Sequence, residues 1–487
     1  MRTRIASRWP LVAAVLVLPL VPNAGAAQLV VPRTVPVQQS GQFDLFPSQR
    51  ASMAGASIAL DDTLLDPFVN PAKTTRLRGV NVFTELVGHS VSMGGGGGQT
   101  VPVGVLASRG AWSGGALLAL QSLDRSATTP FKNFGPRPSN HYTSLLLARQ
   151  LPRGVSVGAS AFHAQLEGLD GMQGLYQGSD SVGLSGRVTD VRAGLTKQWA
   201  RGKSAELMVI HYRNDISHDV RFPIGAWDPN TRTVSTLNQF EHHDDRSRII
   251  GAHAEFVMEN RDSSRFGWLA TVNRLTHPKI PNYRFSNLPR DPGTTYAYNL
   301  GFGAARLADR STFGLDVIYE PMLSHTWAEA GPGMTDESGV PIAPDTRTVE
   351  NRFRFSNIKI AVGWSRDLQA RADTTYETQI DFGLVLHRNS YRLRQENNLS
   401  GAVRHQQVAW TEWGPTFGLK MKLRPLEISY RMRLTCSPGA CSLAQGDDVV
   451  VSPGGPAVIA APGPVLGLDY GYVFTQRLSI TLPLHRW

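Results

Sequence analysis

Apolar and polar residues alternate strictly along several segments of this chain, and this pattern constrains the fold most. Residues 425–434 read PLEISYRMRL, so every second residue is apolar and most of the residues between are polar. Residues 416–424 and 378–387 repeat the pattern. A period of two places successive side chains on opposite faces of a β-strand. The sequence therefore predicts strands with one apolar face and one polar face.

The N-terminus predicts export through a cleaved signal peptide, residues 1–26. Arg2, Arg4 and Arg8 precede an apolar run, and Ala24 and Ala26 fit the small-residue cleavage rule. Beyond this segment no run of about eighteen apolar residues occurs, so no transmembrane helix is expected. The 47 glycines and the charged fraction of 18% suit an outer-membrane barrel, whose strands hide their membrane signal by alternation. We expect the chain in the cell outer membrane.

Connection lengths separate a membrane barrel from a soluble β-sandwich. Short turns are expected at 151–154, 200–203, 260–264, 308–311 and 424–425. Long connections are expected between them, at 122–140, 167–180, 215–244, 277–296, 320–352 and 389–406. Outer-membrane barrels sort short and long connections to opposite ends in this way. The predicted fold class is all-β, a transmembrane antiparallel β-barrel of 14–18 strands formed by residues 77–487.

The expected partners follow from this environment. They are outer-membrane lipid and the outer-membrane assembly machinery, because the last segment, RLSITLPLHRW (477–487), resembles the terminal strand that the machinery reads. No basic nucleic-acid-binding module is recognisable, so no nucleic-acid partner is expected.

Residues 27–76 precede the first strand pattern, and we predict that they form a hatch inside the barrel. Asn70-Pro71-Ala72 ends this segment. The Asn70 side chain can bond to its own backbone, and Pro71 fixes its own φ and biases Asn70 away from helix. The turn would hold the hatch exit at a defined angle to the first strand. The alternative is an ordinary turn that starts a strand.

The segment 52–77, SMAGASIALDDTLLDPFVNPAKTTRL, resembles the N-terminal signature of the FadL/toluene-transporter family, including its PorV-like relatives. The resemblance rests on a Gly/Ala-rich stretch, an acidic step and an Asn-Pro-Ala turn. Matching residues are Met53, Gly55, Ala56, Ala59, Asp61, Asp62, Asn70, Pro71 and Ala72. Residues 468–482 resemble the last hairpin of the family. Lys73 stands where the family usually has glycine.

The resemblance implies a barrel of fourteen strands whose lumen is filled by the hatch. It also implies passive transport of hydrophobic compounds, such as fatty acids or hydrocarbons, without a cofactor and without enzymatic activity. The alternative is a PorV-like secretion-accessory or surface-binding barrel that engages protein partners. Large polar surface loops favour that alternative.

Candidate ligand-binding residues lie in the hatch and on two strands. They are Leu64, Phe68, Lys420, Lys422, Arg431 and Arg433. With Arg424 and Glu427, the basic residues share the polar faces of neighbouring strands. We expect them to line the periplasmic half of the lumen and to contact either the acidic hatch residues Asp61, Asp62 and Asp66 or an anionic ligand head. The alternative is a solvated, partly self-paired wall.

Gly114 and Gly115 lie inside the expected third strand, where glycine often marks a bend. The family resemblance places a kink in that strand, so a lateral opening for hydrophobic cargo is one interpretation. The other is that the glycines make room for a bulky hatch residue such as Phe68.

Three further patterns contain residue types that could form a disulfide, bind a metal or catalyse a reaction. Cys436 and Cys441 enclose a Pro-Gly turn in an exported chain and predict a loop disulfide. The segment EHHDD (241–245) carries metal-type ligands at an expected loop–strand junction, but adjacent histidines on a strand point oppositely. No metal site is therefore predicted. His163, His211 and His253 have no obvious serine partner for a phospholipase-type site.

Overall fold

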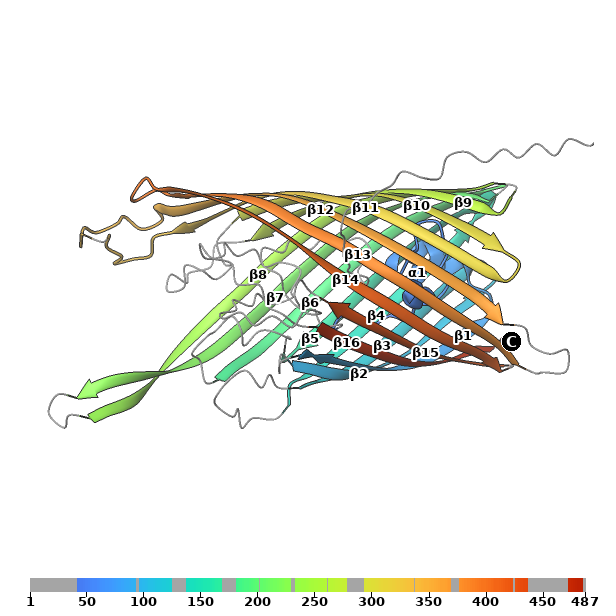
Figure 1. Ribbon diagram of the computed structural model, residues 1–487, viewed down its shortest axis with the longest axis horizontal. Helices are drawn as coiled ribbons and strands as arrows, with labels where there is room; N and C mark the ends of the chain where they lie inside the picture. Colours follow the sequence, from blue (N-terminus) through green and yellow to red (C-terminus); the bar gives the residue numbers. More distant parts are fainter. Residues whose placement is uncertain are drawn as a thin grey trace, which may run out of the picture.

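The described residues of this computed structural model form a closed antiparallel barrel of sixteen strands (Figure 1). The structure describes residues 42–92, 96–124, 137–168, 181–200, 202–228, 233–260, 262–277, 293–336, 338–368, 376–423, 425–436 and 472–484. Sixteen lies within the expected 14–18, whereas the fourteen strands implied by the resemblance are wrong for this chain.

Each strand pairs with its neighbours in sequence, and β1 pairs with β16 to close the barrel, from Val80 opposite Leu484 to Val91 opposite Val473. Closure removes the edge strands that would leave backbone groups unpaired in lipid. The strands are β1 Val80–Val91, β2 Gly96–Arg109, β3 Trp112–Asp124, β4 Ser139–Leu151, β5 Val155–Leu166, β6 Ser181–Trp199, β7 Lys203–Asp228, β8 Thr233–Glu259, β9 Ser264–His277, β10 Gly293–Ala308, β11 Ser311–Glu329, β12 Arg347–Leu368, β13 Tyr376–Asn397, β14 Val403–Leu423, β15 Leu426–Cys436 and β16 Tyr472–Leu484.

The predicted alternation is confirmed along the wall. On β14 the polar or small residues Thr416, Gly418 and Lys420 face the lumen, while Phe417 and Leu419 face outward. Exposed aromatic residues gather on the outer surface near the short-turn end. They include Trp112, Trp199, Trp268, Phe313, Trp364 and Phe382. An apolar outer face bounded by aromatic residues is the surface of an outer-membrane barrel.

No helix in the described part of the chain is both long and apolar enough to cross a bilayer.

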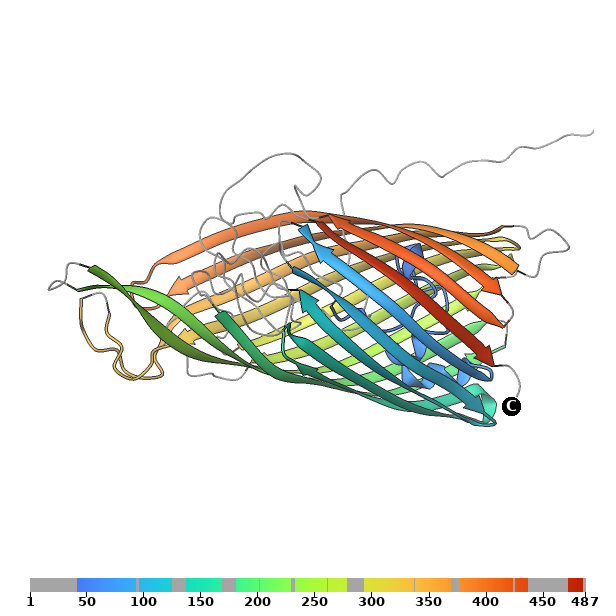
Figure 2. The same ribbon diagram turned by 90° about the horizontal axis from the view of Figure 1, so that it is seen from below.

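The short turns join β4 to β5, β6 to β7, β8 to β9, β10 to β11 and β14 to β15, as the sequence predicts. The expected long loops at 215–244, 320–352 and 389–406 are partly wrong, because strands occupy much of these segments. β7 and β8 run for 26 and 27 residues and pair throughout (Figures 1 and 2). Their polar composition suggested loops, but a paired ladder satisfies the backbone wherever it runs, including outside the bilayer.

Residues 42–79, called the plug below, lie inside the barrel near its short-turn end (Figure 2). They contain η1 (Ala51–Met53), α1 (Asp66–Val69) and η2 (Pro71–Arg76). Phe68 of α1 stacks on Phe46 with ring centroids 4.7 Å apart and meets Phe83 of β1 edge-on at 6.2 Å. The predicted signal peptide (1–26) and the first part of the predicted hatch (27–41) lie outside the described residues.

The bend expected at Gly114 and Gly115 is wrong. β3 pairs with β2 at every position from Trp112 to Asp124 and with β4 from Trp112 to Ser122. A Cβ on Gly115 would lie 2.5 Å from Leu106 Cδ2, and one on Gly114 would lie 2.9 Å from the Leu146 carbonyl oxygen. These glycines make room for the paired strands rather than for Phe68. The ladder leaves no lateral gap along β3.

Candidate functional site: the plug and the lumen wall

The Asn-Pro-Ala turn has the hydrogen bond that its sequence suggests. Asn70 is extended at φ −122° and ψ 109°, and its Oδ1 accepts from the Ala72 backbone N–H at 3.1 Å. Asn70 also packs on the wall, since a Cβ on Gly194 of β6 would lie 1.9 Å from its Oδ1. Arg192 donates to the Val69 carbonyl at 3.2 Å. The turn therefore docks on β6, which an ordinary strand-initiating turn would not require.

Asp62 holds the two halves of the plug together. One carboxylate oxygen accepts from the Ser48 hydroxyl at 2.6 Å and from the backbone N–H groups of Gln49 and Arg50 at 2.8 and 3.1 Å. The other accepts from the N–H groups of Leu64 and Leu65 at 3.2 and 3.1 Å. Hydrogen bonds to a charged acceptor are roughly twice as strong as neutral ones. This fully buried carboxylate therefore links residues 48–50 of the plug to residues 64 and 65.

Asp61 connects the plug to the wall, and Asp66 lies in its interior. Asp61 accepts from Arg76 of the plug and from Arg265 of β9, both at 2.7 Å. Burial alone would raise the pKa of Asp61, but these two guanidinium groups bring it below its usual value. Burial raises the pKa of Asp66 to about 7, against the opposing charge of Lys73.

A buried ionic cluster forms where Lys73 of η2 meets β7 and β8. The Lys73 ammonium lies 3.1 Å from Glu206 Oε2 and 3.7 Å from Glu255 Oε1. His253 Nε2 lies 3.4 Å from Glu206 Oε1, and His253 Nδ1 contacts the Thr271 hydroxyl at 2.8 Å. Ligand atoms of Glu206, His253 and Glu255 lie within 4.8 Å of one another, a spacing that could also hold a metal ion. Lys73 supplies the positive charge that these carboxylates need.

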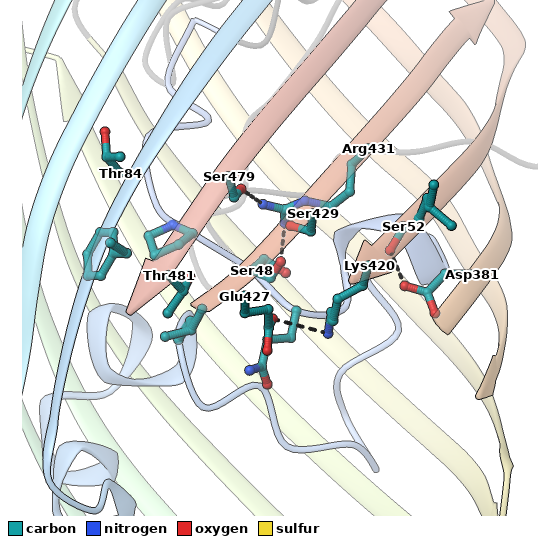
Figure 3. Close-up of a pocket in the computed structure, with 15 residues that line it drawn as sticks. Ser48, Ser52, Thr84, Asp381, Lys420, Glu427, Ser429, Arg431, Ser479 and Thr481 are labelled. Carbon is teal, nitrogen blue, oxygen red and sulfur yellow. Dashed lines mark hydrogen bonds and ion pairs between the residues drawn. The ribbon is translucent and has the colours of Figure 1, made fainter. Parts of the chain in front are cut away.

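Of the predicted basic residues, Lys420 and Arg431 face the lumen, but their partners differ from those expected (Figure 3). Arg431 of β15 donates to the Ser48 carbonyl, to Glu85 of β1 and to the Ser479 hydroxyl. Lys420 lies 3.7 Å from Glu427, as the self-paired alternative supposed. Lys420 and Arg431 do not contact Asp61 or Asp62, whose carboxylates bind within the plug or to Arg76 and Arg265. The alternative contact with an anionic ligand head stays a prediction.

The remaining candidates are dispersed. Lys422 lies exposed at the rim, 3.3 Å from Glu377. Arg424 and Cys441 lie outside the described residues, so the disulfide from the buried Cys436 stays a prediction. The segment 241–245 lies within β8 rather than at a loop–strand junction, and His242 contacts Asp219 at 2.8 Å.

Glu85 and Arg477 are site residues that the sequence reasoning missed. Arg477 of β16 lies 3.2 Å from Glu85 Oε2 and 3.5 Å from Asp44 Oδ2, and it also donates to the Phe46 carbonyl at 3.4 Å. Glu85 shares the inward face of β1 with Phe83 and Val87. An acidic residue between the apolar Phe83 and Val87 on one strand face was the signal that could have found it.

Two cavities lie against the plug. The smaller, about 10 Å³, is lined by Leu64, Lys420 and Arg431 among others (Figure 3). The larger, about 120 Å³, is lined by apolar and by charged side chains. They include Phe46, Ile58, Ile318, Val385, Lys359, Arg433 and Arg477. Ser48 and Arg431 line both cavities, so their hydrogen bond lies at the boundary between them. Phe68 lines neither cavity.

Further apolar surface lies on the lumen side of β12, β13 and β14. Phe353, Phe355, Tyr391 and Trp410 are buried there. The rings of Phe353 and Tyr391 are 5.6 Å apart, and those of Tyr391 and Trp410 are 6.4 Å apart. The interior of the barrel therefore contains a packed aromatic cluster as well as charged residues.

No family model matches the sequence, and no curated protein matches it. Similar solved structures include the CymD monoaromatic hydrocarbon channel, at 10% identity and TM-score 0.37, covering 90% of this chain and 97% of that one. The Ralstonia pickettii toluene transporter TbuX gives 10% identity and TM-score 0.39 at the same coverage. A bacterial polysaccharide outer membrane secretin gives 6% identity and a TM-score of 0.39, and the match covers 84% of this chain and 99% of that one.

Proposed function

We propose that this protein is a passive outer-membrane transporter of hydrophobic compounds, fatty-acid-like or hydrocarbon-like, in which the plug controls passage. The observation that carries the proposal is the 120 Å³ cavity against the plug, where Phe46, Ile58, Ile318 and Val385 form an apolar part of a lining that also holds charged side chains. A cavity of about 150 Å³ lined by apolar residues holds a benzene molecule. The resemblance of residues 52–77 to the FadL/toluene-transporter signature supports the same class of cargo.

The route runs past the plug rather than sideways. The larger cavity borders β9 and β11 to β16, and the described strands form a closed barrel, so no open strand edge offers a compound in it a sideways exit. The Arg431–Ser48 hydrogen bond separates it from the smaller cavity. Passage therefore requires the plug to move from this position. The transport involves no chemical step and no cofactor.

Uptake assays with a cavity-filling variant test the proposal. Val385→Trp places a large side chain in the cavity, whereas Leu384→Trp places it on the lipid-facing side of the same strand. We expect the first variant to reduce uptake of a labelled alkylbenzene or long-chain fatty acid, in cells without another route, to the level of the empty strain. The second should retain wild-type uptake. Equal uptake by the two folded variants would reject the proposal.

A second candidate, a surface-binding or secretion-accessory barrel, is favoured by the extended β7–β8 hairpin. A spanning strand needs only about 9–11 residues, so most of this hairpin projects beyond the membrane band (Figure 1). Ser217 lies directly opposite Asp244, so residues 218–243 can be replaced by an Asn-Gly turn. The shortened barrel should keep hydrophobic uptake under the first proposal. Loss of a surface protein with unchanged uptake would favour the second.

A further inference from the structure

Arginine side chains gather on the outer surface of β12 and β13, away from the lumen. Arg352 and Arg354 of β12 lie directly opposite Arg394 and Arg392 of β13. Their inward-facing neighbours Phe353, Tyr391 and Leu393 are buried, so the period of two directs the four arginines outward. We call these four residues the arginine patch. Residues directly opposite on one face have Cβ atoms about 5 Å apart, and like charges there are destabilising.

The neighbouring carboxylates do not balance this charge. Glu350 is shared among His325, Arg347 and Arg352, at 3.0, 3.2 and 3.3 Å. Glu396 lies 3.1 Å from Arg394. Among the described residues, neither Arg354 nor Arg392 forms an ion pair, and both side chains are exposed. The patch therefore presents a surplus of guanidinium groups to its surroundings.

The distance from the aromatic residues near the short turns gives the height of the patch on the barrel. Trp364 of β12 stacks on Phe382 at 6.0 Å, in the aromatic ring near the short turns. Ile360, Val362 and Leu384 continue the apolar outer face from there. Arg354 lies ten residues from Trp364, about 33 Å along a strand. A tilt of about 40° makes this about 25 Å across the membrane, the height of the apolar band of such barrels.

The patch thus lies past the end of the apolar outer face, beyond the outward-facing Arg388 and Ser390, on the side of the long connections, which in these barrels faces the cell exterior. The planar guanidinium group of arginine can donate two parallel hydrogen bonds to the oxygens of one phosphate group. We propose that the arginine patch binds the phosphate groups of a phosphorylated outer-leaflet glycolipid, whose acyl chains lie along the apolar face below. The bound phosphates supply the anionic partners that Arg354 and Arg392 lack among the described residues. This site does not depend on what the barrel transports.

Native mass spectrometry of the full-length barrel in mild detergent, titrated with bisphosphorylated lipid A, tests the proposal. The variant Arg354→Gln with Arg392→Gln should weaken binding at least about tenfold, because each hydrogen bond to a charged group contributes about that factor. Arg366→Gln, at the other end of β12, is the matched control and should bind like the wild type. Heat-dependent gel mobility checks that each barrel is folded.

Two further titrations identify the ligand. Lipid A without phosphates should bind no better to the wild type than to the double variant. Inorganic phosphate at millimolar concentration should not displace the bisphosphorylated lipid A from the wild type. The proposal is overturned if the double variant binds as tightly as Arg366→Gln, or if dephosphorylated lipid binds as well as the phosphorylated form. Displacement by inorganic phosphate alone would assign a free-phosphate site instead of a lipid site.

Discussion

At the scale of single residues, the contact between Asn70 and Gly194 determines whether the plug exit can dock. A methyl group at position 194 would lie 1.9 Å from Asn70 Oδ1, so Gly194→Ala must displace the turn. Gly183→Ala on the same strand is the matched control, because its nearest neighbour would be 3.7 Å away. We expect trypsin to cleave the plug at Arg76 several-fold faster in the first variant. Identical cleavage rates would show that the turn does not depend on this contact.

Asp66 makes docking of the plug depend on pH. Its pKa is about 7 in the docked plug, mainly because of burial, and 3.8 is the reference value. At a pH between 3.8 and about 7, Asp66 is protonated in the docked plug but ionised in the undocked plug. Docking therefore weakens as the pH rises through this range. From pH 5.5 to 8 the loss is about 2 kcal/mol.

Hydrogen exchange of the plug amides measures this effect. Protection should fall from pH 5.5 to pH 8, after correction for the intrinsic exchange rate, and Asp66→Asn should remove most of the dependence. Protection that rises with pH in the wild type would contradict the assignment.

Lys73 neutralises buried carboxylates, so removing its ammonium group should destabilise docking of the plug on the wall. Lys73→Met leaves Glu206 and Glu255 beside His253 without the ammonium group. Breaking a buried ion pair in this way costs about 3–5 kcal/mol. We expect the plug of this variant to be cleaved rapidly by protease. Adding Glu206→Gln should restore part of the protection, because the two changes are coupled; strictly additive effects would exclude the pairing.

At the scale of elements, the sequence predicted strand faces better than strand lengths. The alternation of residues 416–434 predicted which side chains of β14 and β15 face the lumen, because one face must meet lipid and the other a polar interior. The lengths of β7 and β8 were not predictable in this way. Outside the bilayer both faces are polar, so the pattern no longer separates strand from loop.

Strand alternation also predicted which wall residues of the site face the lumen, but it did not predict their contact partners. Arg431 was found because it lies on a polar strand face. The contacts of Glu85 with Arg431 and Arg477 depend on closure of β1 against β16, which joins residues almost 400 positions apart. Lys73 was visible only as a departure from the family pattern. Its partners on β7 and β8 follow from the position of the plug in three dimensions.

At the scale of the whole molecule, the proposed transport requires passage past Ser48 and Arg431, because the described strands form a closed wall around the plug. Fixing the plug to the wall should therefore stop transport. Ser52 of η1 and Asp381 of β13 touch through a 2.7 Å hydrogen bond. Changing both to cysteine, with Cys436 and Cys441 replaced by serine, allows this contact to be closed by oxidation.

The most direct test of plug-gated transport measures uptake of a labelled hydrophobic compound by this double-cysteine barrel, first oxidised and then reduced. The plug-gated mechanism predicts that uptake falls to the level of the empty strain on oxidation and returns on reduction, while the single-cysteine barrels stay active throughout. Undiminished uptake by a barrel shown to be fully cross-linked would contradict it.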